Sequence, residues 1–117
     1  MSKTLLILGL GGVGCCAAHL AARLPGLHVV VGDVREEHAR QVANSLISVN
    51  FFERAAQRFP RVDAVGLDML HPEEIVRVLE TWQPDVIFNA TTLLSWWHLH
   101  RLPHALARRI YYGAPEG

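Results

Sequence analysis

Four glycines within six residues give the chain its clearest chemical signal. Gly9, Gly11, Gly12 and Gly14 form the pattern G-x-G-x-x-G, with Val13 before the last glycine. Between a strand and a helix, this pattern favours diphosphate binding, because main-chain N–H groups and the positive end of the helix dipole face the phosphates. We expect Gly9 to permit a tight turn, Gly11 to keep the backbone open, and Gly14 to let the helix approach the sheet. A glycine-rich turn without a ligand is the alternative.

An acidic residue follows at the distance that ribose recognition requires. Asp33 comes nineteen residues after Gly14, at the expected end of the second strand. A carboxylate there can accept hydrogen bonds from both hydroxyls of an adenosine ribose. It also repels a 2′-phosphate at close range, so Asp33 favours NAD over NADP. Arg35 weakens this preference, because its guanidinium could stack on adenine or contact a phosphate; a solvated position is equally open for it.

Two later strand ends are expected to border the same ligand, since ligands of open α/β sheets lie beyond the carboxyl ends of the strands. The segment Asp68–Met69 is predicted to flank the adenine, and Asn89–Thr91 the ribose and the diphosphate, with ordinary loop polarity as the alternative for both. The predicted cofactor contacts are Gly9, Gly11, Gly12, Val13, Gly14, Asp33, Val34, Arg35, Asp68, Met69, Asn89, Ala90 and Thr91.

Short apolar runs alternate with amphipathic stretches, which is the pattern of alternating strands and helices. Strands are predicted over 4–9, 27–31, 62–67 and 85–90, and helices over 13–24, 35–59 (as one helix or two), 71–82 and, broken at Pro103, 93–112. Right-handed crossovers then give a parallel sheet in the order 3-2-1-4 with helices on both faces. The predicted fold class is therefore α/β, half of a doubly wound sheet. Residues 1–117 are interpreted as one domain, a part of a longer protein, because the full fold has six strands.

Apolar residues at helical spacing predict which side of each helix is apolar. The stripes are Val13, Ala17, Leu20 and Leu24 on the first helix, Ala39, Val42, Leu46 and Val49 on the second, and Ile75, Val78, Leu79 and Trp82 on the third.

Composition excludes several classes of protein. The chain has 117 residues, of which 50% are hydrophobic and 19% charged, so a folded globular domain is expected. Eleven Lys and Arg balance eleven Asp and Glu, and no basic stripe recurs, so neither a nucleic acid nor a membrane partner is predicted. The two cysteines, Cys15 and Cys16, are adjacent and cannot build a disulfide framework. Residues 3–18 imitate an export signal, but their glycines favour a turn, and a cytoplasmic location is expected.

Two further groups suggest chemistry less strongly. Cys15 is expected in the first turn of a helix, where the dipole could lower the pKa of its thiol; packing of a small residue against the sheet is the favoured interpretation. The histidines His98, His100 and His104 suggest a metal site, but no suitable ligand lies near them in the sequence, and no metal is predicted. No catalytic residue is assigned.

Four blocks of sequence carry a resemblance to a known family. They are residues 7–14, 31–35, 67–74 and 85–91, and they resemble the amino-terminal NAD(P)-binding Rossmann part of saccharopine-dehydrogenase-like oxidoreductases, from about Lys3 to Trp97. The last two blocks are also similar to extended short-chain dehydrogenases. Those enzymes usually carry G-x-x-G-x-x-G, whereas Cys15 stands at the last glycine position here. The resemblance implies a cofactor domain followed by a substrate and dimerisation domain, with hydride transfer to or from an amine-bearing substrate.

Three hypotheses for function follow from these patterns. In the first, the chain is the cofactor-binding part of an NAD(P)-dependent oxidoreductase, inactive alone. Its partners are then the dinucleotide and either a missing carboxyl-terminal domain or a second copy, which would contact the fourth strand and Trp96–Trp97. In the second, it is a ligand-sensing regulatory module, resembling the nucleotide-binding domains of potassium-uptake systems. In the third, the domain has lost its ligand and serves only in assembly.

Overall fold

Strands and helices alternate strictly along the chain. The computed structural model describes residues 3–53 and 61–91. In order, these contain β1 (Lys3–Leu8), α1 (Gly12–Ala21), β2 (Leu27–Asp33), α2 (Glu36–Glu53), β3 (Arg61–Gly66), α3 (Pro72–Trp82) and β4 (Val86–Asn89). Each element predicted within this range is present, with its ends shifted by a few residues. The predicted extension of the second helix to Phe59 and the helix over 93–112 lie outside the described residues.

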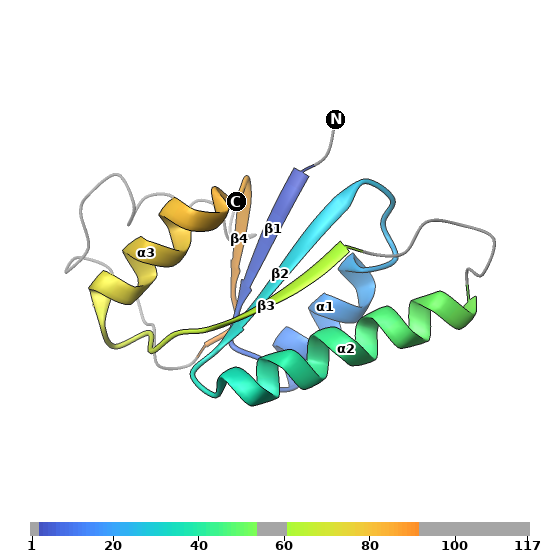
Figure 1. Ribbon diagram of the computed structural model, residues 1–117, viewed down its shortest axis with the longest axis horizontal. Coiled ribbons are helices and arrows are strands. Elements are labelled where there is room, and N and C mark those ends of the chain that lie inside the picture. Colours follow the sequence, from blue (N-terminus) through green and yellow to red (C-terminus); the bar gives the residue numbers. More distant parts are fainter. Residues whose placement is uncertain (1–2, 54–60, 92–117) are drawn as a thin grey trace.

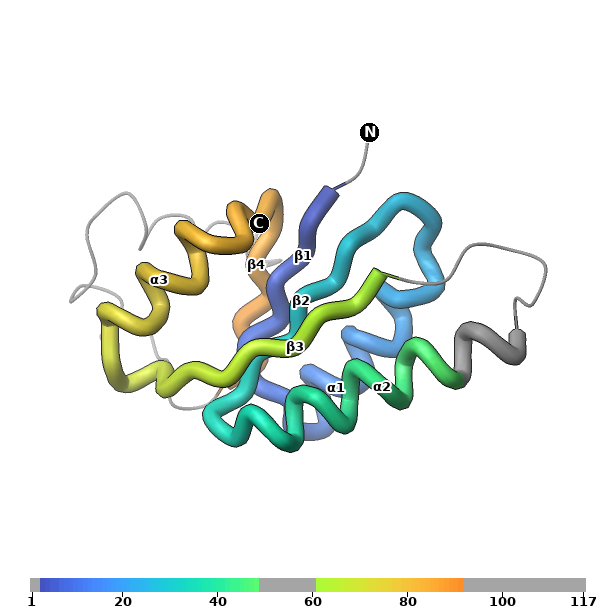
Figure 2. The backbone as a smooth tube through the Cα atoms, viewed as in Figure 1, coloured from blue at the N-terminus to red at the C-terminus, as the bar shows by residue number. Residues whose placement is uncertain are grey.

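The four strands form one parallel sheet in the order β3-β2-β1-β4, which confirms the predicted topology. Ile7 of β1 lies beside Val31 of β2 on one side and beside Phe88 of β4 on the other. The chain steps outward from β1 to β3 through α1 and α2 and then returns through α3 to β4 at the opposite edge (Figure 2). Because every strand runs in the same direction, the loops that follow β1, β2, β3 and β4 all leave the same edge of the sheet.

Helices cover both faces of the sheet, with α1 and α2 on one face and α3 on the other (Figure 1). Alternate residues of the central strands point to opposite faces, so Leu6 and Leu8 pack with α3 while Ile7 packs with α1 and α2. All three side chains are fully buried. The buried face of α3 is formed by Ile75, Val78 and Leu79, with Trp82 partly buried against them, as the stripe on this helix predicts.

Most of the apolar stripe on α1 faces away from the sheet. Val13, Leu20 and Leu24 are 66%, 64% and 57% exposed. The buried face is instead formed by the small residues Gly14, Ala18, Ala21 and Ala22. Small side chains allow the helix to lie close to β1 and β2, so the largest apolar residues are turned outward.

A hydrogen bond between two side chains joins β2 to β3 near the end of the sheet where the strands begin. His28 of β2 is buried, and its Nε2 lies 2.6 Å from Oδ2 of Asp63 on β3. Its ring and the Trp82 ring of α3 form a T-shaped pair with a centroid distance of 5.8 Å. The pair therefore links two strands and a helix at a distance from the carboxyl edge.

Within residues 3–53 and 61–91, every helix is either too short or too polar to cross a lipid bilayer.

Candidate functional site

The turn after β1 requires glycine at its first position. Gly9 has a φ of +91°, a conformation that L-residues rarely adopt, and a β-carbon there would lie 2.8 Å from Cγ2 of Thr91 and 3.2 Å from the Ala90 carbonyl group. The N–H of Gly9 donates to the carbonyl oxygen of Gly32 at 2.8 Å. The turn is therefore packed between the ends of β2 and β4.

Gly14 lets the first turn of α1 lie directly on this bend. A β-carbon at residue 14 would stand 1.8 Å from the carbonyl oxygen of Gly9 and 3.5 Å from the β-carbon of Ala90. No side chain other than hydrogen fits in that space. The sequence predicts this close approach of helix and sheet correctly.

Gly11 and Gly12 lie on the open side of the same turn. Both are exposed, and a β-carbon at either position would meet no heavy atom within 4 Å. The helix begins at Gly12, and within the described part of the chain no side chain caps its amino terminus. The first N–H groups of a helix have no acceptor within the helix. They therefore present donors and the positive end of the dipole, both suited to an anion, to an unobstructed surface.

Asp33 lies at the end of β2 with its carboxylate directed at the glycine turn. Its Oδ2 accepts a hydrogen bond from the N–H of Leu10 at 3.0 Å, and its Oδ1 accepts one from the N–H of Arg35 at the same distance. Only 9% of the residue is exposed. The Arg35 guanidinium is largely exposed, with Nε 3.8 Å from Oδ1 of Asp33. Each carboxylate oxygen keeps capacity for a further hydrogen bond, so the group can both order the turn and accept a donor from a ligand.

Two side chains that the sequence analysis did not place at the site contact the Leu10 carbonyl oxygen. Nε2 of His38, on α2, lies 2.9 Å from it and carries the proton of this hydrogen bond, because a carbonyl oxygen only accepts. Sγ of Cys15, on α1, lies 3.4 Å from the same oxygen. Burial, and secondly the negative charge of Asp33, raise the pKa of the Cys15 thiol. The thiol therefore stays protonated at neutral pH, whereas the helix dipole alone would favour the thiolate.

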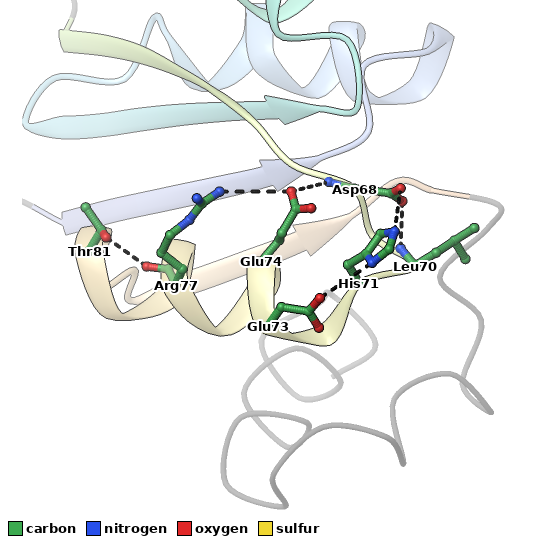
Figure 3. Close-up of polar contacts among 7 residues, drawn as sticks. All are labelled: Asp68, Leu70, His71, Glu73, Glu74, Arg77 and Thr81. Carbon is green, nitrogen blue, oxygen red and sulfur yellow. Dashed lines mark hydrogen bonds and ion pairs between the residues drawn. The ribbon is translucent and has the colours of Figure 1, made fainter.

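At the end of β3, Asp68 is held by the start of α3 (Figure 3). Its Oδ1 accepts the N–H of Leu70 at 3.0 Å, and its Oδ2 lies 3.3 Å from Nε2 of His71, whose Nδ1 is 3.5 Å from Oε1 of Glu73. The N–H of Asp68 donates to Oε1 of Glu74 at 3.0 Å. These contacts fix the carboxylate of Asp68 at the carboxyl edge of the sheet while leaving it 37% exposed.

Met69 does not join this edge through its side chain. The residue is 7% exposed and packs in the core between the sheet and α3. That Asp68–Met69 flanks the adenine stays a prediction, and because the Met69 side chain fills the core, only its main-chain groups are left to face a ligand.

The end of β4 completes the arrangement. Oδ1 of Asn89 accepts hydrogen bonds from the N–H and the hydroxyl of Thr91, at 3.1 and 2.9 Å, and the N–H of Ala90 donates to the carbonyl oxygen of Leu8 at 2.8 Å. This closes a turn against Gly9. The structure thus brings together the glycine turn, Asp33 and the segment 89–91, while Asp68 lies at the next strand end and Val34 is exposed.

No metal-ligating cluster of three His, Cys, Asp or Glu residues occurs in the part of the chain that the structure describes. The histidine trio His98, His100 and His104 and the pair Trp96–Trp97 lie outside the described residues.

Comparisons with known proteins show which solved structures have a similar fold. No protein-family model matches the sequence, and a search of curated proteins gave no match. Among solved structures, L-sorbose reductase from Gluconobacter frateurii, complexed with NADPH and L-sorbose, is 23% identical with a TM-score of 0.62, over 97% of this chain and 46% of that one. Saccharopine dehydrogenase (L-Glu forming) from Saccharomyces cerevisiae is 17% identical with a TM-score of 0.59, over 96% and 19%.

Quinate dehydrogenase from Corynebacterium glutamicum, in complex with NAD, is 22% identical with a TM-score of 0.54, over 78% of this chain and 27% of that one. The chain spans less than half the length of each of these proteins. The likeness shows a Rossmann-like α/β fold.

Proposed function

We propose that this chain binds a nicotinamide dinucleotide through the ADP half of the cofactor. The observation that carries the proposal is the unobstructed helix start at Gly11 and Gly12, in the same turn that the carboxylate of Asp33 contacts. A diphosphate at the helix start and a ribose at the carboxylate would be neighbours, as they are in a dinucleotide.

The other predicted contacts take supporting roles in this proposal. Asn89–Thr91 lie against Gly9 and would border the diphosphate, whereas Asp68 and the exposed Val34 and Arg35 would border the adenosine. Met69 would contribute only main-chain groups. When bound, the nicotinamide would supply hydride-transfer chemistry; the residues of this chain would bind and orient the cofactor.

We propose NAD as the preferred cofactor. The carboxylate of Asp33 would accept a hydrogen bond from the 2′-hydroxyl of NAD but would repel the 2′-phosphate of NADP. The solved structures of similar fold were obtained with NADPH in one case and NAD in another, so the preference depends on Asp33 alone. The positive charge of the neighbouring Arg35, whose Nε lies 3.8 Å from Oδ1 of Asp33, reduces the expected preference for NAD over NADP.

At the level of the whole enzyme, we propose a saccharopine-dehydrogenase-like oxidoreductase. The sequence blocks at 7–14 and 31–35 support this, and saccharopine dehydrogenase is among the proteins of similar fold. Since the matched enzymes extend well beyond the shared region, residues from a further domain or subunit would bind the substrate and transfer the hydride.

Calorimetric titration of the chain with NAD, NADP, ADP-ribose and AMP tests the proposal. We expect weak binding in which ADP-ribose accounts for most of the affinity for NAD, and weaker binding of NADP. Asp33→Ala is expected to weaken ADP-ribose binding, whereas Glu37→Ala, which removes an exposed acid nearby on α2, should bind like the parent chain. Equal binding by Asp33→Ala and the parent would discard the ribose assignment.

A further inference from the structure

Leu10 is held on both sides by side chains from three different elements. Its N–H donates to Asp33 at the end of β2, and its carbonyl oxygen accepts from His38 on α2 and contacts the thiol of Cys15 on α1. Its own side chain is 2% exposed and packs in the core beneath α1 and α2. Leu10 is thus held in place within the turn, whereas its neighbours Gly9 and Gly11 have the least restricted backbone of any residue type.

The direction of the Leu10 carbonyl determines the direction of the next N–H group. In a trans peptide, the C=O and the following N–H point in opposite directions. Because the Leu10 oxygen points toward His38 and Cys15, the N–H of Gly11 points away from these two side chains. Gly11 itself is exposed.

Rotation of this one peptide would reverse the charge that the turn presents. Gly11 lacks a β-carbon and accepts positive φ easily, so sterics alone oppose the rotation only weakly. The rotated peptide would turn the Leu10 oxygen outward, and a carbonyl dipole there would repel the phosphates that the N–H attracts.

We infer that His38 and Cys15 are positioning residues that hold the Leu10–Gly11 peptide in the orientation in which the glycine turn receives a diphosphate. The inference depends on the proposed dinucleotide binding and assigns these residues no contact with the ligand. Both donors are available at neutral pH. The Nε2–H of His38 donates whether or not Nδ1 is protonated, and the raised pKa of Cys15 keeps its thiol protonated.

Paired substitutions separate the hydrogen bond from the packing. In His38→Leu the donor is lost, whereas in His38→Gln the side-chain amide nitrogen can take the place of Nε2. For the thiol, Cys15→Ala removes the donor and Cys15→Ser keeps one. The controls are His19→Leu and Cys16→Ser, which alter exposed residues of α1. The dissociation constant for ADP-ribose is measured by calorimetry at pH 7, and the backbone amide signal of Gly11 is followed in 15N–1H spectra of the free chain.

We expect His38→Leu to weaken ADP-ribose binding about fivefold, the loss expected for one hydrogen bond, and to shift or broaden the Gly11 amide signal. His38→Gln should bind within about twofold of the parent chain. Cys15→Ala should show a smaller loss than His38→Leu, since its contact is longer, and Cys15→Ser little or none. Both controls should behave like the parent.

Unchanged ADP-ribose affinity and an unchanged Gly11 signal in His38→Leu would overturn the inference. So would equal losses in His38→Leu and His38→Gln, since the ring rather than its donor would then matter. Failure of the parent chain itself to bind ADP-ribose would refute the proposed function, and the inference would fall with it. Binding by the parent with no effect of the His38 variants would refute the inference alone.

Discussion

The α-carbon of Gly14 lies so close to the Gly9 carbonyl that a β-carbon at residue 14 would stand 1.8 Å from that oxygen. Neither atom can move alone, because Gly9 is fixed by β1 and Gly14 by the first turn of α1. We therefore expect Gly14→Ala to lower the free energy of unfolding by about 3 kcal/mol, the upper part of the usual range for overpacking. Urea denaturation of the parent and the variant measures this loss.

Gly12→Ala is the matched control for that experiment. A β-carbon at residue 12 would meet nothing within 4 Å, and alanine is favoured over glycine in a helix. Its stability should equal or slightly exceed that of the parent. A Gly14→Ala chain as stable as Gly12→Ala would show that α1 does not lie on the turn as described.

Ionisation of Cys15 should lower stability in alkaline solution. Burial, and secondly the charge of Asp33, raise the pKa of this thiol in the folded chain, so the folded state holds the proton more tightly than the unfolded state does. The resulting stability is fully present below the ordinary thiol pKa of about 8.5 and is lost as the pH rises through the raised pKa of the folded state. Urea denaturation at pH 7 and pH 10 measures the loss.

Serine variants assign this alkaline loss to one thiol. Cys15→Ser cannot ionise in this range and should lose less stability between pH 7 and pH 10 than the parent. Cys16→Ser removes the exposed neighbouring thiol and should lose as much as the parent. Identical pH dependence in the two variants would contradict the assignment to Cys15.

Loss of the hydrogen bond between His28 and Asp63 should lower stability more when the buried His28 is left without its partner than when the more exposed Asp63 is. In Asp63→Ala, the buried Nε2 of His28 loses the acceptor that lies 2.6 Å from it, and an unpaired buried polar group costs about 1–3 kcal/mol. His28→Leu should cost less, because the Asp63 side chain is 44% exposed and water can solvate it. Chemical denaturation of both variants tests the order, and the opposite order would contradict it.

The strands, their order and the glycine turn could be predicted from the sequence because each depends on local pattern. Residues 5–8 are all leucine or isoleucine, as expected of a strand that is covered on both faces. Gly9, Gly14 and Asp33 were placed correctly because the bend, the close helix and the strand end each restrict which residue types fit.

The orientation of α1 and the contacts of Leu10 depend on packing that no local pattern records. The stripe through Val13, Leu20 and Leu24 predicted the apolar side of α1, but the close approach of this helix to the sheet selected small residues for the buried side. His38 reaches Leu10 only because α2 follows β2 at a particular rotation. Its position in the sequence, in the early part of a helix, gave no sign of that contact.

Gly11→Ala tests the central claim most directly, because the fold does not require glycine at this position. The φ of Gly11 is −80°, and a β-carbon there meets no heavy atom within 4 Å, so the variant should unfold at the same urea concentration as the parent. The added methyl group would, however, occupy the space over which a diphosphate must approach the backbone. We predict that calorimetry shows at least tenfold weaker ADP-ribose binding by Gly11→Ala. Undiminished binding by this stably folded variant would contradict the placement of the diphosphate at the glycine turn.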